Sequence, residues 1–114
     1  MKQVTDRQIL TDGQVVFREG QPASIVYLIA HGEVELLKVD ENNKMHPIST
    51  SIAGDFIGVK GLVDAKNYTA TAKVKGAATI IPIAREKIDH ELSKLDKLTL
   101  NIISSTIKKS DTIV

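Results

Sequence analysis

From Gln8 to Ile83 the chain is a series of short β-branched or apolar runs separated by residues that favour turns. The runs read QIL, QVVF, SIVYLIA, GEVELLKV, HPISTSIA, YTATAKV and ATIIPI. Turn signals lie between them at Asp12-Gly13, Glu19-Gly20, His31-Gly32, Glu41-Asn42-Asn43, Ala53-Gly54 and Lys75-Gly76. Short strands with a turn signal at each gap predict an antiparallel sandwich or barrel.

The fourth run shows which side chains face the core. In EVELLKV, Val34 and Leu36 point one way, whereas Glu33 and Glu35 point the other. The segment DENNK that follows predicts a hairpin tip, because Asn and Asp tolerate the left-handed backbone of a tight reversal. Pro82 in the last run predicts an edge position or a bulge, because proline cannot donate a hydrogen bond to a neighbouring strand.

The pattern changes after Ala84. Residues 85–109 contain no Gly or Pro and are rich in Leu, Ile and charged residues, which predicts two helices joined near Ser93-Lys94. In the second helix, about 95–109, apolar residues form two stripes whose centres lie roughly 145° apart at ~100° per residue. The stripes consist of Leu95, Leu98 and Ile102, and of Leu100, Ile103 and Ile107.

A helix with two apolar stripes needs two surfaces to cover it. The stripe at residues 95, 98 and 102 lies closer to the preceding helix, so we assign it to the core of the domain itself. The stripe of Leu100, Ile103 and Ile107 then predicts a homodimer interface. The alternative is one broad apolar face that packs entirely within the monomer.

Composition narrows the class of protein. A chain of 114 residues fits a single domain over 1–114, with the β-structure at about 7–84 and helices at about 85–109. A formal net charge of +1 supplies no electrostatic footprint for DNA or an anionic membrane. The sequence has no cysteine, no signal peptide in its first residues and no apolar run of membrane-spanning length, so we expect a cytoplasmic protein.

The order of these features resembles the cyclic nucleotide-binding domain family, the sensory half of catabolite activator-type regulators. The likeness is carried by GQVVFREGQPAS, VYLIAHGEVELLK, GDFIG, ATA and the helical tail, over roughly residues 10–110. It implies a mainly β fold, an antiparallel double-stranded β-helix of the jelly-roll type (a β-roll), with C-terminal helices. Positive φ is plausible at the glycines that fall at predicted strand reversals. They are Gly13, Gly20, Gly32, Gly54 and Gly58.

The ends of the chain depart from the family. Only about seven residues precede the first run, which leaves little room for the usual N-terminal helix. No helix-turn-helix follows the long helix, so the DNA-reading half of the transcription factors is missing. We therefore expect either an excised domain or a free-standing module.

The stretch GDFIGVKGLVDAKNYTATA, residues 54–72, is similar to the family's phosphate-binding cassette. In the family, helix N-terminal amides point at the cyclic phosphate, a Glu after the second glycine holds the ribose 2′-hydroxyl, and an Arg clamps the phosphate. Val59 stands at the Glu position and Tyr68 at the Arg position, while Thr69 keeps the hydroxyl. Four other cassette residues match, namely Gly54, Asp55, Phe56 and Gly58.

Loss of both charged determinants predicts a degenerate cassette. An unmatched buried hydroxyl costs roughly 1–3 kcal/mol, and ~1.4 kcal/mol is a tenfold change in affinity. The two losses together therefore predict that the affinity for a cyclic nucleotide is lower by several orders of magnitude. Lys60 and Lys66 bracket the loop and offer replacement point charges. Tyr68 either stacks on a ligand ring or fills the space that the nucleotide would occupy, and we favour the second alternative. The residues that any ligand would meet are Gly58, Val59, Lys60, Gly61, Lys66, Tyr68 and Thr69.

No pattern in the sequence supports catalysis or a metal site. His31, His46 and His90 are far apart, and no nucleophile with a paired base or metal-ligand spacing appears. We therefore predict a non-catalytic regulatory or protein-interaction module without a cofactor, which forms a homodimer and does not bind cyclic AMP in the family's usual way. The alternative is a sensor domain that binds cyclic AMP, cyclic GMP or another anionic small molecule through Lys60, Lys66, Thr69 and the loop amides.

Overall fold

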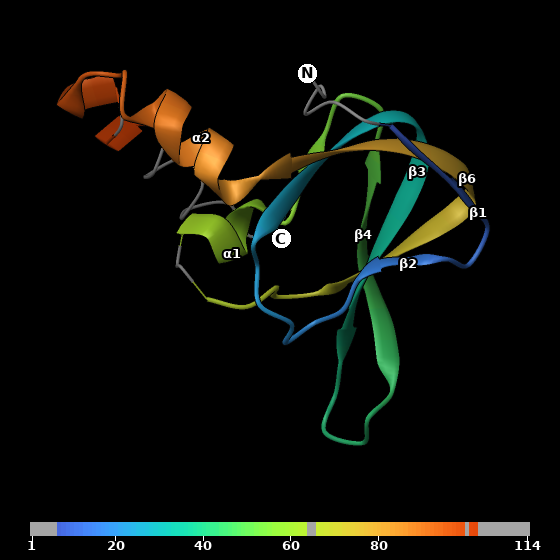
Figure 1. The fold of residues 1–114 in the computed structure, drawn as a ribbon. Coiled ribbons are helices and arrows are strands. Elements are labelled where there is room, and N and C mark those ends of the chain that lie inside the picture. The colour runs from blue at the N-terminus through green and yellow to red at the C-terminus, as the bar shows by residue number, and fades with distance from the viewer. Residues whose placement is uncertain (1–6, 64–65, 100, 103–114) are drawn as a thin grey trace.

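The computed structural model describes residues 7–63, 66–99 and 101–102, and its strands pair antiparallel throughout. The elements are β1 (Gln8–Thr11), β2 (Val15–Phe17), β3 (Ile25–Val39), β4 (Met45–Ile52), β5 (Phe56–Ile57), α1 (Val59–Val63), β6 (Thr71–Ala84) and α2 (Arg85–Leu92). The sheet has the order β1-β6-β3-β4, with β2 beside β6 and β5 beside β3 (Figure 1). The predicted mainly antiparallel β fold followed by helices is confirmed.

Two strands are much longer than the sequence predicts. β3 and β6 run without a break through His31-Gly32 and Lys75-Gly76, which we predicted as turns. The register between the two strands slips twice at this point, so both strands bulge and bend (Figure 1). Gly32 has a φ of 89°, and a Cβ there would lie 2.0 Å from the carbonyl oxygen of Ala77. The prediction of turns was wrong because turns and bulges both favour glycine with positive φ.

The other predicted reversals are present. Glycines 13, 20, 54 and 58 adopt positive φ, and Asn43 does so at the tip of the β3–β4 hairpin with a φ of 64°. The Asp40 carboxylate holds this tip, because it accepts from the backbone N–H groups of Asn42 and Lys44 and contacts the His46 ring at 2.6 Å. The hydrogen bond with His46, followed by those with the backbone, lowers the pKa of Asp40. Figure 1 shows this hairpin extending away from the rest of the sheet.

The core fills the interior of the roll and is mainly aliphatic. Val34 and Leu36 are buried and Glu33 is exposed, as the alternation predicted. Pro82 pairs with β3, whereas β1 pairs with β6 only as far as Ile80 within the described residues, so the predicted edge position is confirmed. The connected core consists of Phe17, Ala23, Ile29, Val34, Leu36, Ile57, Tyr68, Ala70, Ala72, Val74, Ala78 and Ile80.

The C-terminal helices form an arm that projects from the end of β6 (Figure 1). α2 ends at Leu92. The hydroxyl of the next residue, Ser93, donates to the carbonyl of His90, and helical structure resumes at Lys97, so the predicted join is confirmed. Asp96 begins the second helical stretch, since its carboxylate accepts from the Thr99 N–H at 2.7 Å. No described helix is both long and apolar enough to cross a membrane.

One assignment on this arm was wrong. Leu95, Leu98 and Ile102, which we placed in the core of the domain, are 38%, 70% and 58% exposed. The reason is the direction of the arm, which leads away from the sheet instead of folding over it (Figure 1). The predicted interface residues Leu100, Ile103 and Ile107 lie outside the described residues.

Candidate functional site

A hydrogen-bonded turn connects β4 to α1 at the beginning of the cassette. The backbone N–H of Gly54 donates to the carbonyl of Ile29 at 2.8 Å, and the Ile29 N–H donates to the carbonyl of Asp55 at 2.9 Å. The Asp55 carboxylate accepts from the Ile52 N–H at 2.9 Å. These bonds fix the GDFIG segment against β3 and so fix where α1 begins.

The loop after α1 folds back tightly onto the chain. The Lys66 N–H donates to the carbonyl of Gly61 at 3.0 Å, and the Lys66 carbonyl accepts from the Ala23 N–H at 3.1 Å. A Cβ at Gly61 would lie 2.6 Å from the Cβ of Ala23 and 2.9 Å from the carbonyl oxygen of Asn67. Only glycine fits here without movement of the neighbours, so α1 and the turn at Ala23 are in close contact.

Tyr68 occupies the interior of the roll. Its side chain is 6% exposed, and its ring lies over the Phe17 ring with centroids 3.9 Å apart and an interplanar angle of 13°. Tyr27 extends the stack, with its ring centroid 5.9 Å from that of Phe17. The Tyr68 hydroxyl donates to the carbonyl of Ile25 at 2.6 Å and accepts from the Ile25 N–H at 3.3 Å. Burial is the main cause that raises the pKa of Tyr68.

The backbone of Tyr68 is held as firmly as its ring. Its carbonyl accepts from the Gly20 N–H at 2.9 Å, and its N–H donates to the carbonyl of Gln21 at 2.8 Å. A Cβ at Gly58 would lie 3.0 Å from Cε1 of the Tyr68 ring. The ring therefore lies directly against the start of α1, on the side of the cassette that faces the interior of the roll.

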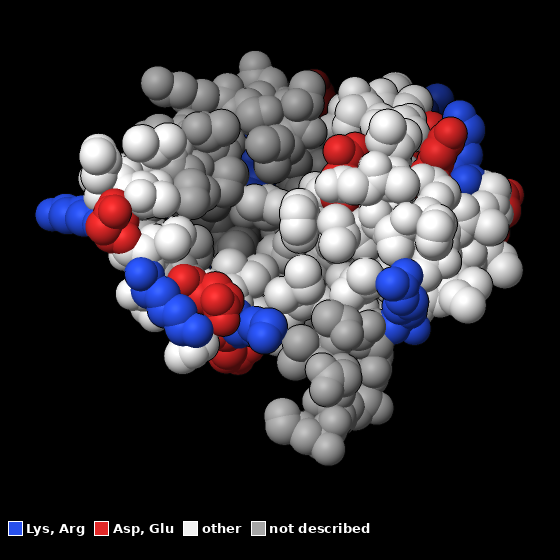
Figure 2. Space-filling view, turned by 90° about the horizontal axis from the view of Figure 1, so that it is seen from above, with Lys and Arg blue, Asp and Glu red and all other residues white. Residues whose placement is uncertain are grey.

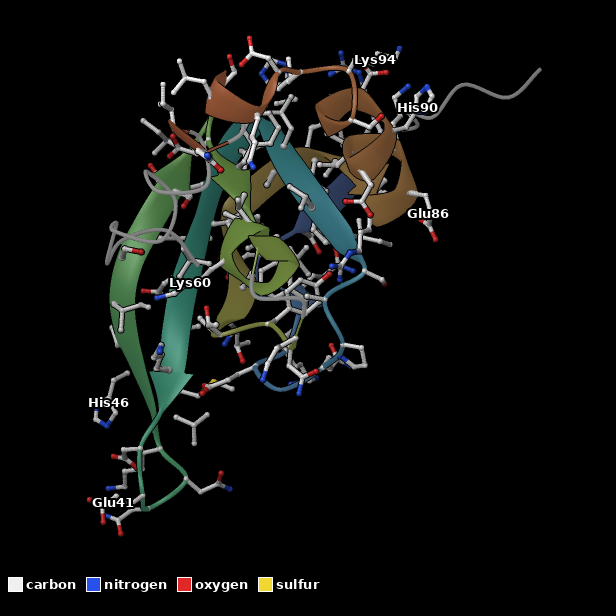
Figure 3. The ribbon with its side chains drawn as sticks, turned by 90° about the vertical axis from the view of Figure 1, so that its left-hand side faces the viewer. Glu41, His46, Lys60, Glu86, His90 and Lys94 are labelled. Atoms are coloured by element: carbon white, nitrogen blue, oxygen red, sulfur yellow. The ribbon has the colours of Figure 1, made fainter. Side chains whose placement is uncertain are left out.

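The remaining predicted site residues differ in what they offer. Val59 is half-buried and has no polar group. Lys60 is half-buried, and Figure 3 shows it on α1, projecting toward the side of β3 and β4. Lys66 is exposed, so its ammonium lies in solvent. The Thr69 hydroxyl and the Ser49 hydroxyl are buried and have no hydrogen-bond partner among the residues that the structure describes.

The structure brings the predicted residues into one place but adds contacts that the sequence did not indicate. Gly58 meets Tyr68, and Gly61 bonds with Lys66. The missed residues are Phe17, Ala23 and Ile25, which lie some forty to fifty positions before Tyr68 in the chain. A local pattern carries no information about contacts at that separation, so only the aromatic character of Phe17 and Tyr68 hinted at the pair.

The three histidines do not form a site. His46 lies at the hairpin and contacts Asp40, whereas His90 lies on α2 at the other end of the molecule (Figure 3). Among the described residues, no group of three or more His, Asp or Glu side chains is placed to hold a metal ion.

The sequence matches the family model described as the cyclic nucleotide-binding domain over residues 7–94. The chain belongs to the cyclic nucleotide-binding domain family. A cAMP-dependent protein kinase regulatory subunit from Blastocladiella emersonii is 30% identical over 84 residues, which are 74% of this chain and 21% of that protein. The family is one of regulatory sensor modules, and this chain spans about a fifth of the length of that relative.

Solved structures share the fold at low sequence identity. The regulatory domain of Toxoplasma gondii PKA, crystallised with cAMP, is 17% identical with a TM-score of 0.77, over 94% of this chain and 40% of that one. The regulatory subunit of a protein kinase A from Trypanosoma brucei, described as cAMP-independent, is 15% identical with a TM-score of 0.79, over 93% and 38%. The same fold thus occurs in a protein bound to cAMP and in one described as independent of it.

Proposed function

We propose that this domain is a non-catalytic regulatory module that works through protein contacts and does not bind cyclic AMP in the family's usual way. The observation that carries the proposal is the position of Tyr68, whose ring and hydroxyl are both engaged inside the roll. The side chain at the position of the family's phosphate clamp is thus part of the core of this protein.

A cyclic nucleotide would meet two separate obstacles. It would have to displace a ring that stacks on Phe17 and bonds to Ile25, which leaves two backbone groups of Ile25 without partners. It would also find Val59 where the ribose hydroxyl needs an acceptor. Each obstacle costs roughly 1–3 kcal/mol, and ~1.4 kcal/mol is tenfold in affinity.

Calorimetric titration tests the proposal. We expect no heat of binding from cyclic AMP or cyclic GMP with the wild-type protein. The double variant Val59→Glu, Tyr68→Arg is expected to gain far more affinity than either single variant, because both side chains hold the same ligand. Saturable micromolar binding to the wild type would refute the proposal, and an inert double variant would mean that the cassette backbone itself is unsuited to the ligand.

The arm is the surface that we propose for association. Leu95, Leu98 and Ile102 are exposed at helical spacing, and an exposed apolar stripe favours a partner. We therefore retain the proposal of a homodimer through the C-terminal helix, with Leu100, Ile103 and Ile107 as a second set of interface side chains. We also propose that a different protein partner binds the same arm. Figure 2 shows positive and negative side chains interspersed on one face, which supports a module that does not bind DNA through that face. We retain the expectation that the module is cytoplasmic.

A second function is favoured by one observation. The Thr69 hydroxyl is buried without a partner, and a polar atom in that state is suited to a ligand that would complete it. Lys60 on α1 and Lys66 in the loop would supply the charge for an anionic small molecule. In this alternative the domain is a sensor with a remodelled cassette, and Thr69→Val would abolish a binding signal that Tyr68→Phe leaves in place.

A further inference from the structure

The strand-to-helix junction at the root of the arm depends on two consecutive residues of the chain. The carbonyl of Ser24 accepts from the N–H of Arg85, the first residue of α2, at 2.9 Å. The next residue, Ile25, pairs with Ala84 in β6 and bonds through both of its backbone groups to the Tyr68 hydroxyl. The root of α2 and the side chain of Tyr68 thus share one short piece of backbone.

The hydroxyl takes the place of a neighbouring strand at Ile25. β5 pairs with β3 only at Tyr27 and Leu28, so the side of Ile25 that faces away from β6 has no strand partner within the described residues. Tyr68 donates to its carbonyl and accepts from its N–H with a single oxygen, which a phenol can do. Removal of that oxygen leaves a backbone N–H and a backbone carbonyl unpaired at the beginning of β3.

The start of α2 is joined to β3 through backbone contacts, namely the bond from Arg85 to Ser24 and the pairing of Ala84 with Ile25. Its N-cap residue, Ala84, has no side chain that can accept from the first helical N–H groups, and no side-chain cap is present. The arm also projects away from the sheet (Figure 1), so we expect these backbone links at its root to set its direction.

We propose that the Tyr68 hydroxyl is a positioning group that holds the Ser24-Ile25 backbone in place and thereby fixes the direction in which the helical arm leaves the roll. The contact makes a continuous path from α1, through the ring beside Gly58, to Ile25 and then to Arg85. The device goes beyond the proposed function, since it concerns the arm and holds whether or not a ligand binds. Its consequence is a module whose association surface keeps a constant orientation.

The chain offers a matched control inside the same aromatic stack. Tyr27 also stacks on Phe17 and is half-buried, but its hydroxyl bonds to no described residue. Tyr68→Phe and Tyr27→Phe each remove one oxygen and keep the ring. Only the first of them removes hydrogen bonds to the backbone of Ile25, so a larger effect of Tyr68→Phe reports on those bonds.

Spin-label distances measure the effect directly. The sequence has no cysteine, so Lys73→Cys in β6 and His90→Cys in α2 provide the only two labels, both at exposed positions. We expect Tyr68→Phe to broaden the distance distribution between the labels at least twofold, and Tyr27→Phe to leave it unchanged. Equal distributions in the two variants, with circular dichroism showing both folded, would overturn the proposal.

A second pair of variants cuts the path at its other end. Proline is tolerated at the first helical position, and the φ of −67° and ψ of 146° at Ala84 suit a residue before proline. Arg85→Pro removes the N–H that bonds to Ser24, whereas Arg85→Ala keeps it, so only the proline variant is expected to broaden the distribution. If Tyr68→Phe added to Arg85→Pro broadens it no further, the two act on one junction; independent, additive broadening would reject the shared path. If Tyr68→Phe does not fold, Arg85→Pro and Arg85→Ala still test whether the bond to Ser24 sets the direction of the arm, and equal distributions in these two variants would overturn the proposal.

Discussion

The cassette and the helical arm differ in how far the folded protein buries their large side chains. In the cassette, the space beside α1 contains Tyr68, 6% exposed and bonded through backbone, ring and hydroxyl. On the arm, Leu98 is 70% exposed and Ile102 58%. The region that we propose no longer binds a cyclic nucleotide thus contains a buried, hydrogen-bonded side chain, while large apolar side chains on the arm are exposed.

The contrast separates two kinds of consequence for a substitution. A change in the cassette removes contacts that the folded monomer uses, so it alters the free energy of unfolding. A change on the arm removes apolar surface that the monomer does not bury, so it alters association and leaves folding almost as it was. Each variant is therefore best tested by measuring both its unfolding free energy and its self-association.

The largest effect is expected for Tyr68→Ala. The substitution removes a buried ring, its stacking on Phe17 and two hydrogen bonds to Ile25, and deletion of a buried aromatic ring costs about 3–5 kcal/mol. Urea unfolding followed by circular dichroism measures the change. Lys66→Ala, in the same loop but exposed, is the control and is expected to change stability by less than about 0.5 kcal/mol. Similar values for both would show that the ring is not part of the core.

Gly61→Ala tests how tightly the cassette is closed. In a helix, alanine is normally favoured over glycine by about 1 kcal/mol, so an uncrowded site would be stabilised. Here the added Cβ would lie 2.6 Å from the Cβ of Ala23 and 2.9 Å from the Asn67 carbonyl oxygen. We therefore expect a net destabilisation of about 1–3 kcal/mol in the same unfolding assay. A gain in stability would mean that α1 moves freely away from the turn at Ala23.

Alkaline pH should act through the buried tyrosine. The pKa of Tyr68 is raised in the folded protein, chiefly by burial, so the unfolded state loses this proton first, near pH 10. The contribution of Tyr68 to stability is then complete below about pH 10 and declines as pH rises toward the folded-state pKa. Unfolding measured between pH 8 and 11 should show a shallower decline in Tyr68→Phe than in the wild type. Equal slopes would contradict the raised pKa.

Leu98→Asp should have the smallest effect on folding, because Leu98 is 70% exposed. We expect a change in unfolding free energy within about 0.5 kcal/mol, together with weaker self-association in sedimentation velocity. Lys97→Asp, one position away, is the control and should associate like the wild type. A wild type that stays monomeric at high micromolar concentration would exclude the homodimer, and an unfolded Leu98→Asp would place the stripe in the core after all.

Much of the fold could be predicted because its signals are local. The alternation in EVELLKV gave the orientation of Val34 and Leu36, and the tip at Asn43 and the join at Ser93 follow from residue type alone. The bulges at Gly32 and Gly76 were mistaken for turns, because a glycine with positive φ serves both. Whether such a glycine bends a strand or ends it depends on the opposite strand, here the Ala77 carbonyl beside Gly32.

The missing charged residues of the candidate site could be predicted from the sequence, but the contacts that Tyr68 makes in their place could not. Val59 and Tyr68, at the positions that we align with the family's charged residues, are visible in the sequence, and so is the absence of an acceptor at Val59. That Tyr68 packs on Phe17 and bonds to Ile25 depends on contacts between residues 43 to 51 positions apart, which no local pattern reports. The direction of the arm was missed for a similar reason, since the bond between Arg85 and Ser24 at its root joins residues that are far apart in the chain.

The pairing of β6 with both of the first two strands has a consequence for the order of folding. β1 pairs with β6 at Ile9 and Thr79, and β2 pairs with it at Val15 and Lys73, so β1 and β2 complete their pairing only after β6 has been synthesised. Contacts at such separation slow folding because a long loop must close before they form. Until Ile80 has been synthesised, the early apolar strands have exposed edges, and a chain truncated before that point should aggregate instead of forming a smaller roll.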